Sequence, residues 1–247
     1  MTPTDDKYRA PALDKGLDIL ELLASQPKGM TRSEIVKSLG RSSSEIYRML
    51  ERLVIRGYVN RSLEGDRFAL SIKLFELGAT FPPVRRIVDR AQPLMDAFAR
   101  RSLQSIHLAV PDRGKIFIVA QATSHAAWEF RLRLGAELDL LTTGSGQTLL
   151  AFSTPEEREH LLTLASETTV PDTFASDLAE IFEEGHRIRP SQQLIGVTDI
   201  SVPVFTGPGG AVGVLTCPFL PRVDQQNQQI EDCLSMVLET AQNIRLA

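Results

Sequence analysis

The chain has 247 residues, enough for two domains, and its apolar content of 43% suffices to bury a core in each. No apolar run approaches the roughly 18 residues that a membrane span requires, and residues 1–11 are too polar and acidic for a secretory signal. We therefore expect a cytoplasmic protein. The two cysteines, Cys217 and Cys233, lack metal-ligand spacing, which favours buried apolar thiols over a zinc site or a disulfide framework.

The net charge of −4 is divided unevenly, with +2 on residues 1–81 and −6 on residues 82–247. Between Lys28 and Arg61 the chain holds eight basic and three acidic side chains, a net charge of +5. A basic patch inside an acidic chain is expected of a surface that contacts nucleic-acid phosphates. The alternative is a solvated helix face with scattered arginines.

The first predicted elements are three helices. Residues 1–11 show no hydrophobic period and are interpreted as a flexible arm, after which a helical stripe of leucine and isoleucine runs from Leu13 to just before Pro27. Two Ser/Thr-x-x-Glu capping boxes, at Thr31–Glu34 and Ser42–Glu45, then predict two helix starts separated by a turn at Gly40. A helix, a tight turn and a second helix form the arrangement that places a recognition helix in the DNA major groove.

Short β-rich segments at 58–61 and 67–70 flank the sequence Glu64–Asp66 and predict a hairpin, the wing of a winged helix-turn-helix domain over residues 12–71. Ser43, Ser44, Tyr47 and Arg48 are expected near the end of the recognition helix that reaches base edges. For Arg48 the alternative is that it braces the motif or holds a phosphate. Four further arginines are placed for phosphates: Arg32, Arg41, Arg52 and Arg67.

A linker over residues 72–83 separates the two domains. It contains a predicted helix at 72–81 that Ser71 can cap and that the pair Pro82 and Pro83 ends. The helix has more apolar residues than one narrow stripe needs, so some are expected to contact a second subunit.

The second domain, residues 84–247, reads as a long helix followed by strands and further helices. The predicted helix at 84–103 contains Pro93, which should kink it. Three strands are predicted at 105–110, 115–121 and 128–134, the last from the strict alternation of apolar and charged residues. Helices at 143–152, 155–165 and 172–184, a hairpin of strands at 200–205 and 211–219, and a helix at 225–246 complete an α+β domain built on an antiparallel sheet.

In the order and spacing of several segments, the chain resembles the IclR-type bacterial transcriptional regulators from about Ala12 onward. The segments that carry the resemblance are Ala12–Leu20, Tyr47, Arg48 and Leu50, Arg56–Tyr58, Glu76–Gly78, His107–Val110, Thr142–Phe152 and Gly196–Val204. The resemblance implies a winged helix on double-stranded operator DNA, a homodimer or dimer of dimers, and a C-terminal GAF-like domain that binds a small organic effector, often a carboxylate or an aromatic compound.

The turn Thr142–Gly146 opens a helix, so its backbone N–H groups and the positive end of the helix dipole could bind an anion. Alternatively, its two glycines only permit close packing of the helix on the sheet. The resemblance favours the ligand, because this turn corresponds to part of the family's effector pocket. A nucleotide-binding P-loop is excluded, since it would need lysine at Gln147.

Departures from the family pattern concern the same pocket. This chain has Arg189 where many members carry acidic residues, which favours an anion at that edge, and it has Asp199 where they have cysteine or serine, which favours a hydroxyl, amine or cation. Thr216 stands where a serine is frequent. The effector site is expected to comprise Leu138, Thr143, Gly144, Ser145, Arg189, Val197, Asp199 and Thr216.

The four histidines, His107, His125, His160 and His186, share no metal-ligand spacing and are interpreted as satisfied or surface residues. No local motif indicates a catalytic triad or a cofactor. The sequence therefore predicts a non-enzymatic, effector-controlled transcriptional regulator, either repressor or activator. Two alternatives stay open: an enzyme built on the C-terminal domain, and a DNA-binding module whose pocket is vestigial.

Overall fold

The computed structural model describes residues 10–63, 66–124, 126, 130–165, 173–222 and 230–246, and the chain forms two compact units, Met1–Phe81 and Pro82–Ala247. Both the α+β class and the winged helix-turn-helix are confirmed. No helix among the described residues is both long enough and apolar enough to cross a membrane.

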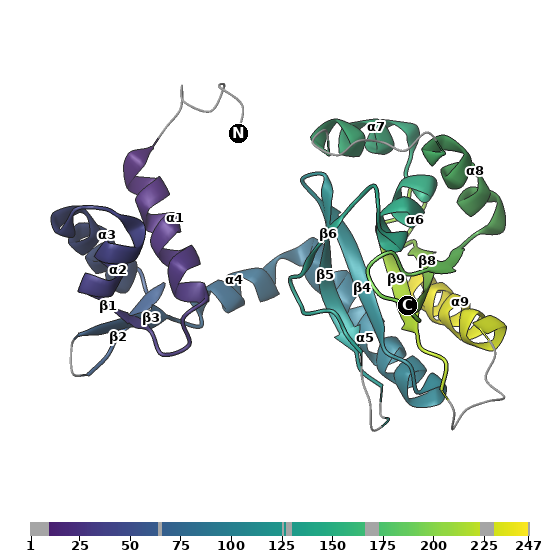
Figure 1. Ribbon diagram of the computed structural model, residues 1–247, viewed down its shortest axis with the longest axis horizontal. Helices are drawn as coiled ribbons and strands as arrows, with labels where there is room; N and C mark the ends of the chain where they lie inside the picture. Colours follow the sequence, from purple (N-terminus) through teal and green to yellow (C-terminus); the bar gives the residue numbers. More distant parts are fainter. Residues whose placement is uncertain are drawn as a thin grey trace. The chain divides into compact units, whose positions relative to one another are not determined.

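The first unit packs three helices on a small sheet, as Figure 1 shows. The helices are α1 (Pro11–Ala24), α2 (Arg32–Leu39) and α3 (Ser43–Ile55). The strands are β1 (Met30–Thr31), β2 (Val59–Arg61) and β3 (Arg67–Leu70), in the order β1-β3-β2. Strand β1 is too short to be recognised from sequence, because two residues carry no periodicity.

Local sequence signals set the helix boundaries of this unit. Both predicted capping boxes form, with the Thr31 and Ser42 hydroxyls accepting from the backbone N–H groups of Glu34 and Glu45. Gly40 adopts the left-handed conformation (φ 60°) at the end of α2. The free backbone N–H groups at each helix start thus find their acceptors within four residues of chain, which explains why the sequence predicted both starts.

Helix α4 (Lys73–Thr80) follows the wing and has no buried residue. The Lys73 ammonium donates to the Arg56 carbonyl at 2.6 Å, and the Ser71 hydroxyl accepts from the Lys73 backbone N–H at 3.2 Å. The helix ends before Pro82, as predicted, but α5 (Pro82–Ser102) begins at that proline and continues through Pro93. A proline pair can both end one helix and occupy the first turn of the next, where its missing N–H has no partner to lose.

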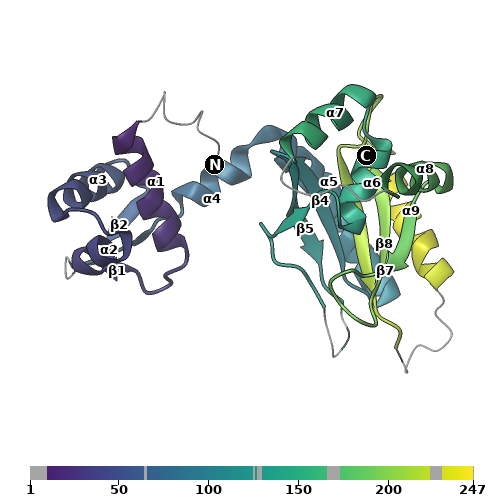
Figure 2. The same ribbon diagram turned by 45° about the horizontal axis from the view of Figure 1, so that its top comes forward.

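The second unit is a six-stranded antiparallel sheet with helices on both faces (Figure 2). The strands are β4 (Ile106–Asp112), β5 (Lys115–Ala122), β6 (Glu137–Asp139), β7 (Arg187–Pro190), β8 (Thr198–Val204) and β9 (Gly213–Phe219), in the order β6-β5-β4-β9-β8-β7. Helices α5 and α9 (Ile230–Leu246) enclose one core with the sheet, which includes Met95, Phe98 and Val237. Helices α6 (Gly144–Phe152) and α8 (Phe174–Glu184) enclose the other, which includes Leu149 and Ile181, and α7 (Pro155–Leu164) lies between them in sequence.

The predicted third strand at 128–134 is wrong. Residues 128 and 129 lie outside the described residues, whereas 130–134 form irregular chain and a turn that leads through Gly135 (φ 74°) to β6. The edge strand is instead Glu137–Asp139, which pairs with Lys115–Phe117 of β5. A short alternating run is compatible with a strand, but in the folded domain it is the segment after the turn that pairs with β5.

The two cysteines are free and buried, as the sequence indicated. Cys217 on β9 and Cys233 on α9 have their sulfur atoms 3.7 Å apart in the core between the sheet and α9. Burial raises the pKa of the Cys217 thiol, so it stays protonated and apolar in character.

Candidate functional site

Helix α3 divides sharply into a buried and an exposed face. Ile46 and Leu50 are fully buried against the three-helix core, with Met49 and Leu53 packed beside them. On the opposite face lie Ser43, Ser44, Tyr47, Arg48 and Arg52, all exposed. The predicted base-reading residues therefore share one solvent-facing surface that starts at the helix N-terminus.

The arginines predicted to bind DNA differ in how firmly the protein already holds them. In the described part of the chain, no ion pair involves Arg48 or Arg52, whereas Arg41 pairs with Asp18 at 2.9 Å. Arg32 lies over the Tyr47 ring, 5.6 Å from its centroid. Among the arginines predicted to bind DNA, Arg48 and Arg52 on α3 are therefore the two whose guanidinium groups no described ion pair or ring contact holds.

Arg67, in the wing, has its guanidinium bonded within the domain. It donates to the Gly29 carbonyl at 2.9 Å and lies 3.8 Å from the Glu34 carboxylate, while Glu34 also belongs to the α2 capping box. Arg67 therefore joins the wing to the start of α2, which is a structural role beside the predicted phosphate contact.

A cavity of about 170 Å³ lies in the second unit between the N-terminus of α6, the sheet and the segment after β7. A cavity of this size suits a small metabolite rather than a nucleotide. Its lining comprises His107, Phe130, Leu132, Leu138, Thr142, Thr143, Gly144, Ser145, Arg187, Ser191, Gln192, Gln193, Leu194, Asp199, Thr216 and Pro218.

Strand register produces a row of polar residues across the sheet. Directly paired neighbours in an antiparallel sheet project from the same face, and here Arg187 pairs with Ser201, Ser201 with Thr216, Thr216 with His107, and His107 with Gln121. The row contributes one polar side chain from each of five strands, β7, β8, β9, β4 and β5. We call it the polar row.

Arg187, at one end of the polar row, is a buried guanidinium with little internal compensation. It is 6% exposed, its Nε donates to the Gln147 side-chain oxygen at 3.0 Å, and it forms no ion pair with any residue that the structure describes. Burial lowers its pKa, with Asp199 and Asp177 acting in the opposite sense. A buried positive charge without an ion-pair partner is costly, and an anionic ligand would compensate it.

The predicted anion contact Arg189, two residues later on β7, is not in this cavity. It is paired with Glu180 at 2.5 Å, and that hydrogen bond raises its pKa. Residues 187 and 189 share one face of β7, because side chains alternate with a period of two, so the difference lies in their position along the strand. Arg187 pairs with Ser201, whereas Arg189 pairs with Asp199, one strand repeat away. Val197, predicted as an apolar wall, is 6% exposed and does not line the cavity.

The hydroxyl groups of the polar row are connected to one another and to α6. Thr216 lies 2.9 Å from the Ser201 hydroxyl and 2.9 Å from the Ser145 hydroxyl, and all three are buried. Thr143 caps α6 by accepting from Gly146 and donating to the Asp139 carbonyl. These hydroxyl groups hold α6 on the sheet, and the cavity is bounded by a preorganised polar floor.

The two glycines of the α6 turn differ in their surroundings. A side chain at Gly146 would place its Cβ 2.1 Å from the Leu140 carbonyl oxygen, so this glycine permits close packing. Gly144 borders the cavity, where a Cβ would lie 3.0 Å from the Arg187 Nη1 and 3.1 Å from the Ser201 hydroxyl. The guanidinium therefore lies against the first turn of α6, and both contribute positive potential to the cavity.

Asp199 lines the cavity as predicted. It lies on β8 two residues before Ser201, one strand repeat from the polar row. Burial raises its pKa, while a hydrogen bond from Ser191 and the charge of Arg187 lower it. The carboxylate partly offsets the positive potential of Arg187 and offers an acceptor to a donor group on a ligand.

His107 was interpreted as a satisfied or surface histidine, and this interpretation is wrong. It is 5% exposed, lines the cavity, and its Nε2 is buried without a hydrogen-bond partner among the described residues. Burial lowers its pKa to about 4, so the imidazole is neutral at physiological pH. The sequence signal that could have found it is a polar residue at an inward position of an otherwise apolar strand.

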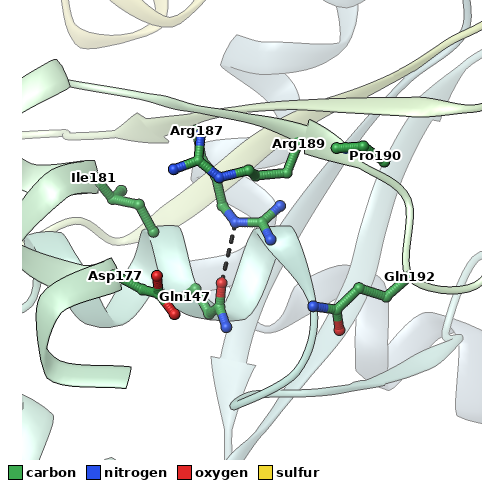
Figure 3. Close-up of a pocket in the computed structure, with 7 residues that line it drawn as sticks. All are labelled: Gln147, Asp177, Ile181, Arg187, Arg189, Pro190 and Gln192. Carbon is green, nitrogen blue, oxygen red and sulfur yellow. Dashed lines mark hydrogen bonds between the residues drawn. The ribbon is translucent and has the colours of Figure 1, made fainter. Parts of the chain in front are cut away.

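A second cavity, of about 290 Å³, lies on the α8 side of Arg187 (Figure 3). It is lined by Gln147, Asp177, Ile181, Arg187, Arg189, Pro190 and Gln192. Arg187 and Gln192 line both cavities, so these two long side chains form part of the wall between them.

Comparison with known proteins defines the class. Residues 12–62 match the IclR helix-turn-helix domain, and residues 83–246 match the domain described as bacterial transcriptional regulator IclR C-terminal. Together these matches cover most of the chain. The protein belongs to the IclR family of bacterial transcriptional regulators, and it is a DNA-binding protein of that family.

Individual relatives are distant but match over most of the chain. The HTH-type transcriptional regulator KdgR of Escherichia coli (strain K12) is 27% identical over 238 residues, covering 93% of this chain and 89% of the relative. The glycerol operon regulatory protein of Streptomyces coelicolor is 28% identical, covering 82% and 83%. Both relatives are named as regulatory proteins.

Solved structures share the fold. The Thermotoga maritima IclR has a TM-score of 0.75 at 24% identity, covering 95% of this chain and 97% of its own. An IclR homolog from Microbacterium hydrocarbonoxydans, complexed with 4-hydroxybenzoate, has a TM-score of 0.77 at 22% identity, covering 95% and 98%.

Proposed function

We propose that this regulator binds a small organic carboxylate in the cavity beneath α6 and that this effector changes its affinity for operator DNA. The observation that carries the proposal is Arg187, a buried guanidinium without an ion-pair partner in the described residues, placed beside the N-terminus of α6. The Microbacterium homolog, which is complexed with a carboxylate, supports the same ligand class.

The expected pose follows from the charges. The carboxylate lies between the Arg187 guanidinium and the first backbone N–H groups of α6, where the helix dipole favours an anion. A donor group on the ligand is directed to Asp199, and the body of the ligand packs on Leu138 and Leu132. The effector shifts operator affinity only as far as it distinguishes the DNA-competent from the incompetent state.

The test is operator binding by the full chain, with and without a panel of small carboxylates. A carboxylate effector should alter the operator Kd, and Asp199→Ala should abolish or change this response while leaving effector-free operator binding intact. Gly144→Val should block the response, because its side chain would displace the Arg187 guanidinium. If no acid binds or alters operator affinity, the pocket is vestigial; if an acid is chemically converted, the protein is an enzyme.

For the DNA side, we propose that the exposed face of α3 enters the major groove, with Ser43, Ser44, Tyr47 and Arg48 at the bases and Arg52 at a phosphate. The support is their common exposure at the N-terminal half of the helix. Arg32, Arg41 and Arg67 are proposed to contact phosphates in addition to their contacts within the domain.

We also propose a two-fold dimer that reads a pseudo-palindromic operator. One recognition helix reads few base pairs, so specificity requires two half-sites at fixed spacing. Helix α4 and its flanks expose large apolar side chains that a second subunit would cover, including Ile72 at 66%, Phe75 at 70% and Phe81 at 55%.

Sedimentation measures this association. Phe75→Ser should weaken the dimer by at least about tenfold, since burying a phenylalanine contributes roughly 1.5 to 3 kcal/mol. Leu63→Ser, at a fully exposed wing position, is the matched control and should leave the mass unchanged. A monomer at micromolar concentration that binds half-sites as tightly as whole operators would contradict the dimer.

A further inference from the structure

The polar row ends, away from Arg187, in two buried polar atoms without partners. The Nε2 of His107 and the Oε1 of Gln121 are both buried and lack a hydrogen-bond partner among the described residues. They stand on adjacent strands as directly paired residues, and His107 borders the cavity. Buried polar atoms nearly always have partners, so this end of the cavity is suited to a polar group on a ligand.

The imidazole determines what kind of group fits there. Burial holds the pKa of His107 at about 4, so at physiological pH it carries no charge that would compensate a second carboxylate. A neutral imidazole exchanges a hydrogen bond with a hydroxyl or a carbonyl oxygen. A ligand that matches the polar row thus has a single negative charge at the Arg187 end and a neutral polar group at the His107 end.

The distance between the two ends limits the ligand further. The Arg187 Nη1 and the Ser201 hydroxyl are both about 3 Å from the position of a Cβ on Gly144, so the guanidinium lies above β8. Strand β9 separates β8 from the strand of His107, and two strand spacings amount to about 10 Å. A hydroxyl on the carbon next to the carboxylate is too close to the anion to reach His107.

We infer that His107 determines effector specificity and that the effector is a monocarboxylate with a hydroxyl or carbonyl oxygen at its far end. The inference rests on the proposed function, because it assigns the carboxylate to Arg187. Phe130, Leu132 and Leu138 line the cavity and provide apolar walls for the body of such a molecule.

Three probes separate the possibilities: benzoate and two isomers that each add one hydroxyl to it, 2-hydroxybenzoate and 4-hydroxybenzoate. All three carry one carboxylate on the same ring, and only the last has its hydroxyl at the far end. Calorimetric titration of the full chain at pH 7 should show 4-hydroxybenzoate bound roughly 3- to 10-fold more tightly than benzoate, the range for one neutral hydrogen bond. 2-Hydroxybenzoate carries its hydroxyl beside the carboxylate, on the Asp199 side of the cavity, and should show no gain that depends on His107.

Variants then assign the discrimination to the residue. His107→Phe should bring the ratio between 4-hydroxybenzoate and benzoate to within about twofold, because the ring is retained and the hydrogen-bonding nitrogen is lost. His107→Gln should retain part of the ratio. His160→Phe, at an exposed position on α7, is the matched control and should leave the ratio unchanged. Unfolding curves of each variant confirm that the fold is intact.

A second series, pentanoate with its 2-hydroxy and 5-hydroxy derivatives, repeats the test with an aliphatic body. The inference is overturned if acids bind without preferring the distal hydroxyl in either series, or if His107→Phe keeps that preference. In that case an acid that still alters operator affinity leaves the proposed function standing. If no acid of either series binds, both the inference and the carboxylate assignment fail.

Discussion

The two units of this protein place their polar residues by different means. In the winged helix, Thr31 and Ser42 act on backbone groups three residues away, and the arginines of α3 extend into solvent. In the sheet domain, Arg187, Thr216 and His107 come from three separate strands and are buried in the same polar row. A nucleic-acid surface can be built from one helix, whereas a small-molecule cavity needs side chains converging from several elements.

This difference predicts that substitutions in the polar row have larger effects than substitutions on α3. Arg187→Met, which keeps the volume and removes the charge, should weaken carboxylate binding roughly 30- to 1,000-fold, or about 2 to 4 kcal/mol. Titration calorimetry with the tightest-binding acid measures this loss. Arg189→Gln is the matched control on the same strand and should change affinity less than threefold. Equal losses of carboxylate affinity in the two variants would contradict the assignment of the anion contact to Arg187.

The buried histidine should give the sheet domain a loss of stability between about pH 6.5 and 4, a range above the one in which the lowered pKa of Glu45 acts in the winged helix. The folded pKa of His107, about 4, lies below the ordinary value of 6.5, so its neutral form stabilises the fold fully above about pH 6.5. This contribution is lost as the pH falls toward 4, and it amounts to at most about 3 kcal/mol. Urea unfolding from pH 7 to 4 should show a steeper decline for the wild type than for His107→Gln. Parallel declines would contradict the assignment.

On the DNA side, Arg48→Ala should cost roughly 1 to 3 kcal/mol at the operator and relax base preference, because its guanidinium is exposed and outside any described ion pair. Arg52→Ala, one turn further along α3, should weaken all sequences alike and reduce the salt dependence of binding. Fluorescence anisotropy with operator and scrambled duplexes separates the two patterns. Unchanged preference in Arg48→Ala would show that another element reads the bases.

The smallest expected effect concerns local capping. Ser42→Ala should destabilise the winged helix by about 1 kcal/mol, since it leaves the Glu45 backbone N–H without its acceptor. Ser43→Ala, the neighbouring exposed serine inside α3, should change the unfolding free energy by less than about 0.5 kcal/mol. Both changes in unfolding free energy are measured by thermal unfolding, from the transition that belongs to the winged-helix unit. A larger loss for Ser43→Ala would mean that the helix starts one residue later.

The sequence by itself determined those features that depend on neighbours along the chain. Both capping boxes, the stop at Gly40, the apolar stripe of Ile46 and Leu50, and the helix start at Thr143 involve partners within about four residues. Overall order and spacing also identified the IclR family, and with it the two-domain architecture.

The tertiary structure decided which polar residues of the sheet meet. Positions 187 and 189 differ by one strand repeat, and only the register with Ser201 and Asp199 determines that the first is buried beside Gly144 and the second is paired with Glu180. Likewise, His107 gains its significance from residues about 14 and 109 positions away, Gln121 and Thr216. Such contacts leave no local periodicity, because the hydrogen-bond partners of a strand are chosen by the sheet that forms around it.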